Sequence, residues 1–492
     1  MVNGSVAYTL QDNSIQEIEV AESPVKYCNV TLSDVISRGK RLEASVFDVE
    51  AKQAYSSIKM SKFGFLPLIG SSSFVKAAYH APRFRRNYVH KHSEDAVGFL
   101  GSAEMLDSYP HPEKYITRKM ANELHLFAPE NTVLVSCSGT IGNVSYNNKS
   151  LSKYALSQHI IRLECNENSG YLYACLKHKC LQKQLQSLIY GAVIQEIEPH
   201  HLEKVIIPNA SEEIKKRIND LIVASYALRD ESNALIDEAT ALLKEELHFP
   251  DIHDFNVALY KKDAGVDTFS VKLSKIAGRV DASYHVPIVN AIVEHMKEYA
   301  AEVTTVGDKR ISKEIILPGR FKRVYVEEGY GRVFIGGKQI HELDPVNKKY
   351  LSLVHHGDRI SKQLELHEGM TLITCSGTIG KVTLVGKHWE NWTANQHIIR
   401  IVPTDKDIAG YLNIFLSSEY GYYLITRYTY GSVVDEIDDN HVRQIAIPLL
   451  KNKDVQKKIN DLALEANEKR YEAYKLEQQA LRIMDDEVIY AK

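Results

Sequence analysis

Residues 136–142 read "SCSGTIG" and residues 374–380 read "TCSGTIG", so one seven-residue stretch occurs twice, 238 positions apart. Residues that favour strands lie on both sides of the two glycines in each copy, in "LVSCSGTIGNVSY" and "LITCSGTIGKVTL". This pattern predicts a strand, a glycine turn and a second strand. A turn of this kind that recurs within one chain raises the question of how far the repeat extends.

The repeat extends over most of the chain, because further blocks recur in the same order on both sides of this turn. They are "RLEAS" (41–45) and "RVDAS" (279–283), "PRFRRNYV" (82–89) and "GRFKRVYV" (319–326), "FLGSAEM" (99–105) and "FIGGKQI" (334–340), "SQHIIRL" (157–163) and "NQHIIRI" (395–401), and "YGAVIQEIE" (190–198) and "YGSVVDEID" (430–438). "HLEKVIIP" and "HVRQIAIP" follow, ending at Pro208 and Pro448. The spacing predicts a tandem duplication of one domain-sized unit of roughly 240 residues.

Each repeat has a compact part followed by a long helical tail. Short runs such as "TVLVSCS" and "HIIRLEC" predict strands, and "SGYLYACLKHKCLQKQLQSLI" predicts a helix, which together indicate a mixed α/β or α+β domain. In each tail, apolar or small residues recur at steps of three and four with no Gly or Pro between them. These residues are Ile214, Ile218, Leu221, Ser225, Leu228, Ser232, Leu235, Ala239 and Leu242, and then Val455, Ile459, Leu462, Ala466, Lys469, Ala473, Leu476, Ala480 and Ile483.

The two tails are interpreted as coiled-coil helices, each trailing one copy of the domain. If a pseudo-two-fold axis relates the copies, the helices pair antiparallel. The alternative is that each helix packs as an amphipathic helix on its own core. The predicted boundaries are residues 1–208 for the first domain, 209–248 for a central long helix, 249–448 for the second domain and 449–492 for a C-terminal long helix.

Composition excludes several classes of protein. The net charge of −3 argues against a uniformly basic nucleic-acid binder, although residues 51–100 hold eight Lys and Arg against two Asp and Glu. The beginning of the sequence lacks the pattern of a signal peptide, and no apolar run is long enough to span a membrane, so a cytoplasmic protein is expected. The six cysteines show no paired CxxC spacing, so neither a disulfide framework nor a zinc site is expected.

The repeated turn does not match a catalytic loop. A cysteine phosphatase loop needs an arginine six residues after the cysteine, but Asn143 and Lys381 stand there. The P-loop and nucleophile-elbow patterns also lack required residues. Cys137 and Cys375 are therefore interpreted as structural, and no catalytic residue is predicted elsewhere in the chain.

The ordered motifs resemble the specificity subunit of type I restriction-modification systems. The resemblance rests on the R-[LV]-[DE]-A-S opening, the SGTIG turn, the [SN]-Q-H-I-I-R strand, the YG-[AS]-V turn and a strand ending in Pro before a long helix, each occurring twice. It covers the chain from about Val30 onward. It implies two target recognition domains separated by two long antiparallel coiled-coil helices, each domain reading one half of a split, asymmetric DNA site.

The resemblance also implies partners. Two adenine methyltransferase (modification) subunits would dock on the helices, and nuclease-translocase (restriction) subunits would complete the complex. No cofactor is expected in this chain, because S-adenosylmethionine, ATP and Mg²⁺ would be bound by those partners. The chain itself is then a non-catalytic DNA-binding subunit.

Candidate DNA-binding residues come from two groups. The first mixes cations with aromatic residues in both copies, as phosphate-contacting surfaces do: Arg83, Arg85, Arg86 and Tyr88, and then Arg320, Lys322, Arg323 and Tyr325. The second comes from the turns and from positions that differ between the copies: Ser138, Thr140, Gln195, Lys338, Ser376, Thr378, Lys381 and Asp435. Shared arginines are expected to position phosphates, and unmatched residues to read bases. The alternative for the first group is an ordinary solvated strand face whose Phe is in the core.

Two other functions remain open on the sequence. The chain could be the DNA-recognition subunit of a type II system with a split site, working with a fused methyltransferase-nuclease partner. It could also be a protein-interaction scaffold that does not bind DNA.

Overall fold

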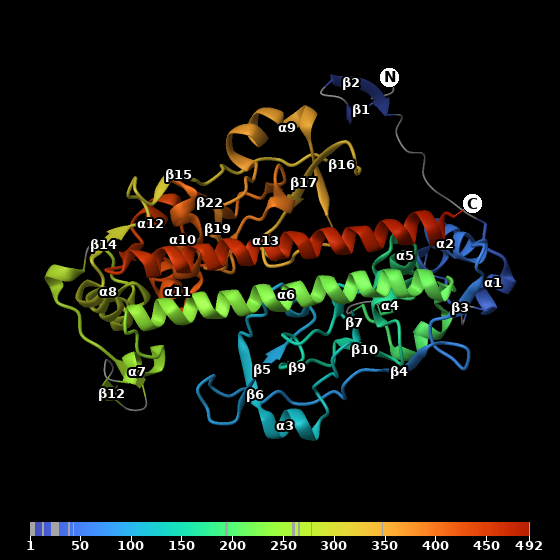
Figure 1. Ribbon diagram of the computed structural model, residues 1–492, viewed down its shortest axis with the longest axis horizontal. Coiled ribbons are helices and arrows are strands. Elements are labelled where there is room, and N and C mark those ends of the chain that lie inside the picture. The colour runs from blue at the N-terminus through green and yellow to red at the C-terminus, as the bar shows by residue number, and fades with distance from the viewer. Residues whose placement is uncertain are drawn as a thin grey trace. The chain divides into compact units, whose positions relative to one another are not determined.

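The computed structural model of the protein (Figure 1) describes residues 5–11, 14–20, 29–37, 40–42, 44–191, 195–257, 261–263, 266–276, 278–346 and 348–491. The chain divides into two units. The N-copy unit comprises Glu22–Asp230, Glu342–Val346 and Glu472–Lys492, and it contains the first repeat. The C-copy unit comprises Met1–Ala21, Glu231–His341 and Asn347–Tyr471, and it contains the second.

The N-copy unit is built around a four-stranded sheet in the order β4-β10-β7-β8. Its strands are β4 (Val75–Tyr79), β10 (Ile160–Cys165), β7 (Val133–Ser136) and β8 (Val144–Tyr146), all paired antiparallel. The smaller sheets are β6 (Lys114–Thr117), β5 (Ala96–Leu100) and β9 (Ala155–Leu156), and β11 (Ile206–Pro208) with β3 (Phe65–Pro67). The helices are α1 (Leu32–Ser37), α2 (Val49–Lys59), α3 (Arg118–Glu123), α4 (Ser169–Lys177) and α5 (Lys179–Ser187).

The C-copy unit repeats this plan with the sheet β15-β22-β19-β20. Its strands are β15 (Ser312–Ile316), β22 (Ile398–Pro403), β19 (Thr371–Thr374) and β20 (Val382–Leu384). The smaller sheets are β16 (Tyr325–Val326), β18 (Lys349–Ser352), β17 (Gly331–Ile335) and β21 (Thr393–Ala394), and β14 (Glu302–Thr305) with β23 (Ala446–Leu449). The helices are α7 (Ile252–Val257), α8 (Pro287–Tyr299), α9 (Leu353–Arg359), α10 (Lys406–Ser417), α11 (Glu419–Thr426) and α12 (Asp439–Arg443). Two hairpins, β1 (Ser5–Gln11) with β2 (Ser14–Val20) and β12 (Lys261–Asp263) with β13 (Val266–Thr268), complete the unit.

The arginine of the repeated "HIIR" strand is fully buried in both copies. Arg162 donates to the carbonyl oxygens of Leu126 and Leu156, each at 3.0 Å. Arg400 donates to the carbonyl oxygens of Leu364 and Ala394, which are the counterparts of Leu126 and Leu156. A buried guanidinium needs such acceptors, because an unpaired charge in the interior is costly. The central sheet and the loops beside it are therefore tied together identically in the two copies, and the mixed α/β repeat expected from the sequence is confirmed.

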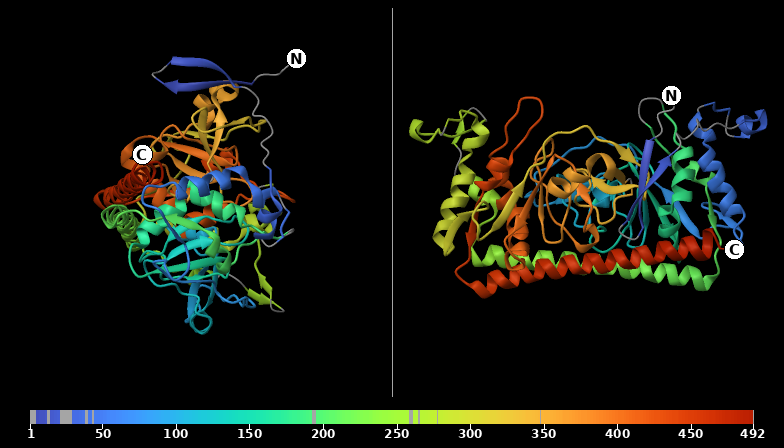
Figure 2. Two further views of the ribbon diagram at one scale, coloured as in Figure 1. Left: turned by 90° about the vertical axis from the view of Figure 1, so that its right-hand side faces the viewer. Right: turned by 90° about the horizontal axis from the view of Figure 1, so that it is seen from above.

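The two helical tails form α6 (Glu212–Glu246) and α13 (Lys453–Ile483), each about 50 Å long at 1.5 Å per residue. Within each unit their segments lie side by side and run antiparallel (Figures 1 and 2). In the N-copy unit, Arg217 pairs with Glu487 and Arg229 with Glu477. In the C-copy unit, Glu231 pairs with Lys469 and Glu238 with Lys458. The partner's number falls as the number along α6 rises, which is the antiparallel pairing that the repeat predicted.

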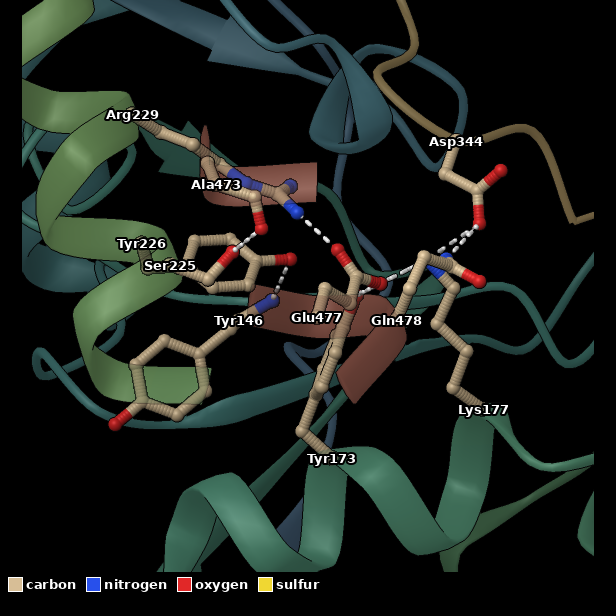
Figure 3. Close-up of polar contacts among 10 residues, drawn as sticks. All are labelled: Tyr146, Tyr173, Lys177, Ser225, Tyr226, Arg229, Asp344, Ala473, Glu477 and Gln478. Carbon is tan, nitrogen blue, oxygen red and sulfur yellow. Dashed lines mark hydrogen bonds and ion pairs between the residues drawn. The ribbon is translucent and has the colours of Figure 1, made fainter. Parts of the chain in front are cut away.

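Small residues on the two helices allow their backbones to come close. In the N-copy unit, the hydroxyl of Ser225 donates to the carbonyl oxygen of Ala473 at 2.8 Å (Figure 3). Ser232, Ala239, Ala466 and Ala480 are also buried. The predicted seam therefore holds at these positions. The buried set also contains polar residues outside the predicted seam, among them Arg229 and Glu477.

Glu477 is the centre of a buried polar cluster in the N-copy unit (Figure 3). Its carboxylate accepts hydrogen bonds from Lys177 and Tyr173 on α4 and from Arg229 on α6. Burial alone would raise the pKa of this carboxyl, but the charges of Lys177 and Arg229 outweigh it and lower the pKa to about 2. The cluster thus joins the mixed α/β domain of this unit to both long helices.

Candidate DNA interface

The repeated SGTIG turn lies between two other repeated motifs in each copy. The backbone N–H of Cys137 donates to the carbonyl of His159 at 2.9 Å, and its carbonyl accepts from Ile197 N–H at 2.9 Å. The equivalent bonds of Cys375, to His397 and Ile437, are 2.9 Å and 3.0 Å. The turn therefore connects the Q-H-I-I-R strand to the end of the YG loop.

In each copy, a surface arginine forms an ion pair with a glutamate of the YG block. Arg83 donates to the Glu196 carboxylate at 3.0 Å, and Arg320 donates to Glu436 at 2.9 Å. Each glutamate also forms a β-bridge with the serine of the turn, Ser138 or Ser376. The arginine side chains remain 75% and 79% exposed, so their remaining N–H groups face solvent. A guanidinium that binds a glutamate through one terminal Nη atom and keeps its other N–H groups exposed can still donate to a phosphate oxygen.

Behind these arginines lies the same set of aromatic contacts in both copies. Phe84 packs edge-on against Phe99, which also lies near the side chains of Arg86 and Tyr88. In the second copy, Phe334 is the corresponding core ring, and Phe321, Arg323 and Tyr325 lie around it. Phe84 and Phe321 thus pack against the core rings, and Arg86 and Arg323 lie partly buried beside the same rings. The exposed cations of the segment are Arg83, Arg85, Arg320 and Lys322. The packing of the Phe rings fits an ordinary strand face with Phe in the core. The exposed cations of the same segment stay accessible for the predicted DNA contact.

One lysine in each copy lies against the tyrosine ring of the segment described above. Lys114 lies 5.4 Å from the centre of the Tyr88 ring, and Lys349 lies 5.2 Å from that of Tyr325. Both lysines begin a strand, β6 or β18, which pairs beside β5 or β17. Sequence reasoning missed them because they belong to no matched block. It also missed Glu196 and Glu436, although both lie within the matched YG block.

The environments of the histidines and cysteines in the matched blocks favour their uncharged forms. Burial lowers the pKa of His159 and of His397, and the nearby charges of Arg86 and Arg323 lower them further. Burial raises the pKa of the Cys137 and Cys375 thiols to about 12, so both stay protonated at neutral pH. A protonated, buried thiol is a poor nucleophile, which agrees with the structural role expected for both cysteines.

The predicted site residues differ in their exposure. Exposed residues are Arg83, Arg85, Tyr88, Thr140, Gln195, Arg320, Lys322, Tyr325, Lys338, Thr378 and Asp435; partly buried residues are Arg86, Arg323, Ser376 and Lys381; Ser138 is buried. Arg83, Ser138 and their counterparts are brought together through Glu196 and Glu436. Asp435 joins the second site, because its carbonyl accepts from the N–H of Gly377 at 2.9 Å. Three residues of the first YG loop, 192–194, and Cys28 lie outside the described residues.

Metal clusters and membrane spans are both absent from the part of the chain that the structure describes. No cluster of His, Cys, Asp and Glu side chains suited to a metal ion occurs among the described residues. No helix in the described ranges is both long enough and apolar enough to cross a membrane.

Comparison with known families adds to this geometry. Residues 111–237 match the family model described as "Type I restriction modification DNA specificity domain". This segment is therefore similar to the type I DNA specificity domain. It contains the first SGTIG turn, the Q-H-I-I-R strand, the YG block and the first part of α6. The match confirms the resemblance to type I specificity subunits that the duplicated motifs indicated.

Two solved structures are similar to this chain. One is the S subunit of a type I restriction-modification system from M. genitalium, at 12% identity and a TM-score of 0.30, covering 85% of this chain and 96% of that chain. The other is the HsdS subunit from Thermoanaerobacter tengcongensis, at 13% identity and a TM-score of 0.26, covering 79% and 89%. No curated protein sequence matches this chain.

Proposed function

We propose that this chain is the DNA-binding specificity subunit of a type I restriction-modification complex. Each recognition domain reads one half of a bipartite, asymmetric DNA site and directs adenine methylation or restriction by partner subunits. The observation that carries the proposal is the same three-motif site in both copies, with its exposed arginine, within a chain that carries a specificity domain.

The two sites share their positioning residues and differ where bases would be read. The arginine–glutamate pairs and the aromatic contacts are common to both sites. In contrast, Gln195 in the first YG loop is replaced by Asp435 at the equivalent position of the second. Shared phosphate contacts with different base contacts are what an asymmetric, split site requires. Modification subunits and a restriction subunit would supply S-adenosylmethionine, ATP and Mg²⁺, and the chain itself would be non-catalytic.

The test is to co-express the chain with a methyltransferase encoded by a neighbouring gene, in a host that lacks adenine methylation, and to map methylated adenines by single-molecule sequencing. We expect a split motif with a fixed gap, methylated on both strands. The control replaces both Arg83 and Arg320 by Ala, which should reduce methylation at the same motif. A continuous motif, or no methylation with the wild-type chain, would overturn the proposal.

A further inference from the structure

A cavity of about 490 Å³ in the N-copy unit is lined by several basic side chains. Lys52 and Lys59 project into it from α2, and Lys204 lies at the end of the short 3-10 helix Pro199–Lys204. Arg41 and His201 also line it. Among the described lining residues, the only acid is Asp34. The cavity thus concentrates positive charge in a chain whose net charge is −3.

The cavity is built by fixed contacts between the elements around it. The hydroxyl of Tyr55 on α2 donates to the carbonyl of Lys204. Arg41 donates to the carbonyl of Ile189 at 2.7 Å. Lys52, Lys59 and Lys204 have no acidic partner within the part of the chain that the structure describes. Unpaired cations that are held close together repel one another, so an anion that binds between them is favoured.

The equivalent positions of the C copy do not carry the same basic residues, so the two copies can be compared within one chain. Asn290 and Gln444 occupy the positions of Lys52 and Lys204, so two cations are absent. Tyr284 replaces Val46, and its ring lies 4.6 Å from both the Arg279 and the Arg427 guanidinium groups. Arg427 itself stands where the N copy has Ser187.

The remaining cations of the C copy have partners. Arg279 pairs with Asp281 at 2.6 Å, and Lys297, the counterpart of Lys59, pairs with Glu294 at 2.8 Å. Arg427 donates to the carbonyl of Tyr284 at 3.3 Å and lies against the Tyr284 ring. The scaffold is therefore shared by both copies, but the three lysines without an acidic partner among the described residues belong to the N copy. A purely structural role for these lysines would not explain why the C copy keeps the scaffold with Asn290 and Gln444 at two of the three positions.

We propose that this cavity binds a phosphate-bearing ligand between Lys52, Lys59 and Lys204. A volume of about 490 Å³ is within the ~300–1,000 Å³ range of small-molecule sites, and the cations would neutralise two or more phosphate charges. The phosphate could belong to the DNA backbone or to a free polyphosphate. The cavity borders the YG loop, because His201 packs 5.0 Å from the Tyr190 ring and Arg41 binds the carbonyl just before it.

The experiment makes two copy-matched changes to the full chain. The double variant Lys52→Asn with Lys204→Gln installs the residues of the C copy, and Lys297→Gln is the control in the other copy. Binding of inorganic triphosphate is measured by isothermal titration calorimetry at low salt. DNA affinity is measured as a function of salt with each variant, and urea unfolding checks that the variants fold.

A free polyphosphate ligand predicts that the double variant binds triphosphate at least tenfold more weakly, while the salt dependence of DNA binding is unchanged. A DNA phosphate predicts that the slope of log K against log salt falls by about 0.9 for each phosphate that the variant no longer neutralises. The control should change neither quantity. The proposal is overturned if both quantities are the same in the double variant and the wild type, or if Lys297→Gln has an equal effect. The triphosphate measurement does not depend on DNA recognition, so failure here is distinguishable from failure of the proposed function.

Discussion

Arg229 on α6 and Glu477 on α13 form an ion pair in which the glutamate side chain is fully buried and the arginine is only 10% exposed. Lys177 on α4 is the second cation on the same carboxylate. The repeat places Ile236 at the position equivalent to Glu477 and Ser417 at that of Lys177. The cluster therefore occurs in one copy, and its loss would affect the N-copy unit.

Glu477→Gln should destabilise the protein by about 3–5 kcal/mol, because it leaves two buried cations without a counter-charge. Urea unfolding measures the loss. The matched control is Lys469→Gln, which removes the partly exposed partner of the exposed Glu231 and should cost less than about 1 kcal/mol. Similar losses in the two variants would contradict the buried pairing.

The partly buried carboxyl group of Glu342 should make the stability of the protein depend on pH. Its carboxyl pKa is raised from 4.5 to about 8, first by burial and then by the charges of Asp107 and Asp344. The folded state therefore holds a proton that the unfolded state releases, so this contribution to stability is complete below about pH 4.5 and is lost as the pH rises through about 8.

In Glu342→Gln the side chain cannot ionise, so the fall in stability between these pH values should be smaller. Thermal unfolding from pH 5 to pH 9 compares the variant with the wild type. Glu368→Gln, which changes an exposed carboxylate in the other unit, serves as the control. A wild-type and a Glu342→Gln curve of the same shape would show that Glu342 is ionised in the folded protein.

The sequence predicted the repeat, the mixed domains and the long helices because these depend on local patterns. Glycine turns, strand-forming runs and the three-four spacing each lie within a short window. It did not predict the pairing of Arg83 with Glu196, since 113 residues separate them and only the folded sheet brings them together. It also missed Arg229 and Glu477, because charged residues normally lie outside a seam and their burial depends on each other.

Arg83→Ala and Arg320→Ala should each weaken DNA binding on all sequences and reduce the salt slope by about 1, because each removes one phosphate contact. Fluorescence anisotropy with specific and unrelated duplexes at several salt concentrations measures both effects. Lys475→Ala changes a cation on α13 and should leave the slope unaltered. A changed sequence preference in either arginine variant would assign that arginine to base reading instead.

Asp435→Gln should alter the preferred base at one position of one half-site. A carboxylate accepts a hydrogen bond from the amino group of cytosine, whereas glutamine can form two hydrogen bonds with N6 and N7 of adenine. A good two-bond pair of this kind is worth about 1–3 kcal/mol of discrimination. Methylation mapping of the variant complex reads out the change. The reciprocal variant, Gln195→Asp, should affect the other half-site. If each variant changed both half-sites equally, or changed neither, Asp435 and Gln195 would not be the residues that read these bases.

Cys137→Ala and Cys375→Ala should leave DNA affinity within about twofold, because the backbone groups that hold the turn remain. Each should cost about 1 kcal/mol in urea unfolding through the small cavity that the missing sulfur leaves. Thiol-specific alkylation of the folded protein provides a second measurement. Because both thiols are buried and their pKa values are raised to about 12, neither should react before unfolding. Rapid alkylation with loss of DNA binding, or loss of binding in both stably folded variants, would restore a functional role for the cysteine of the repeated turn.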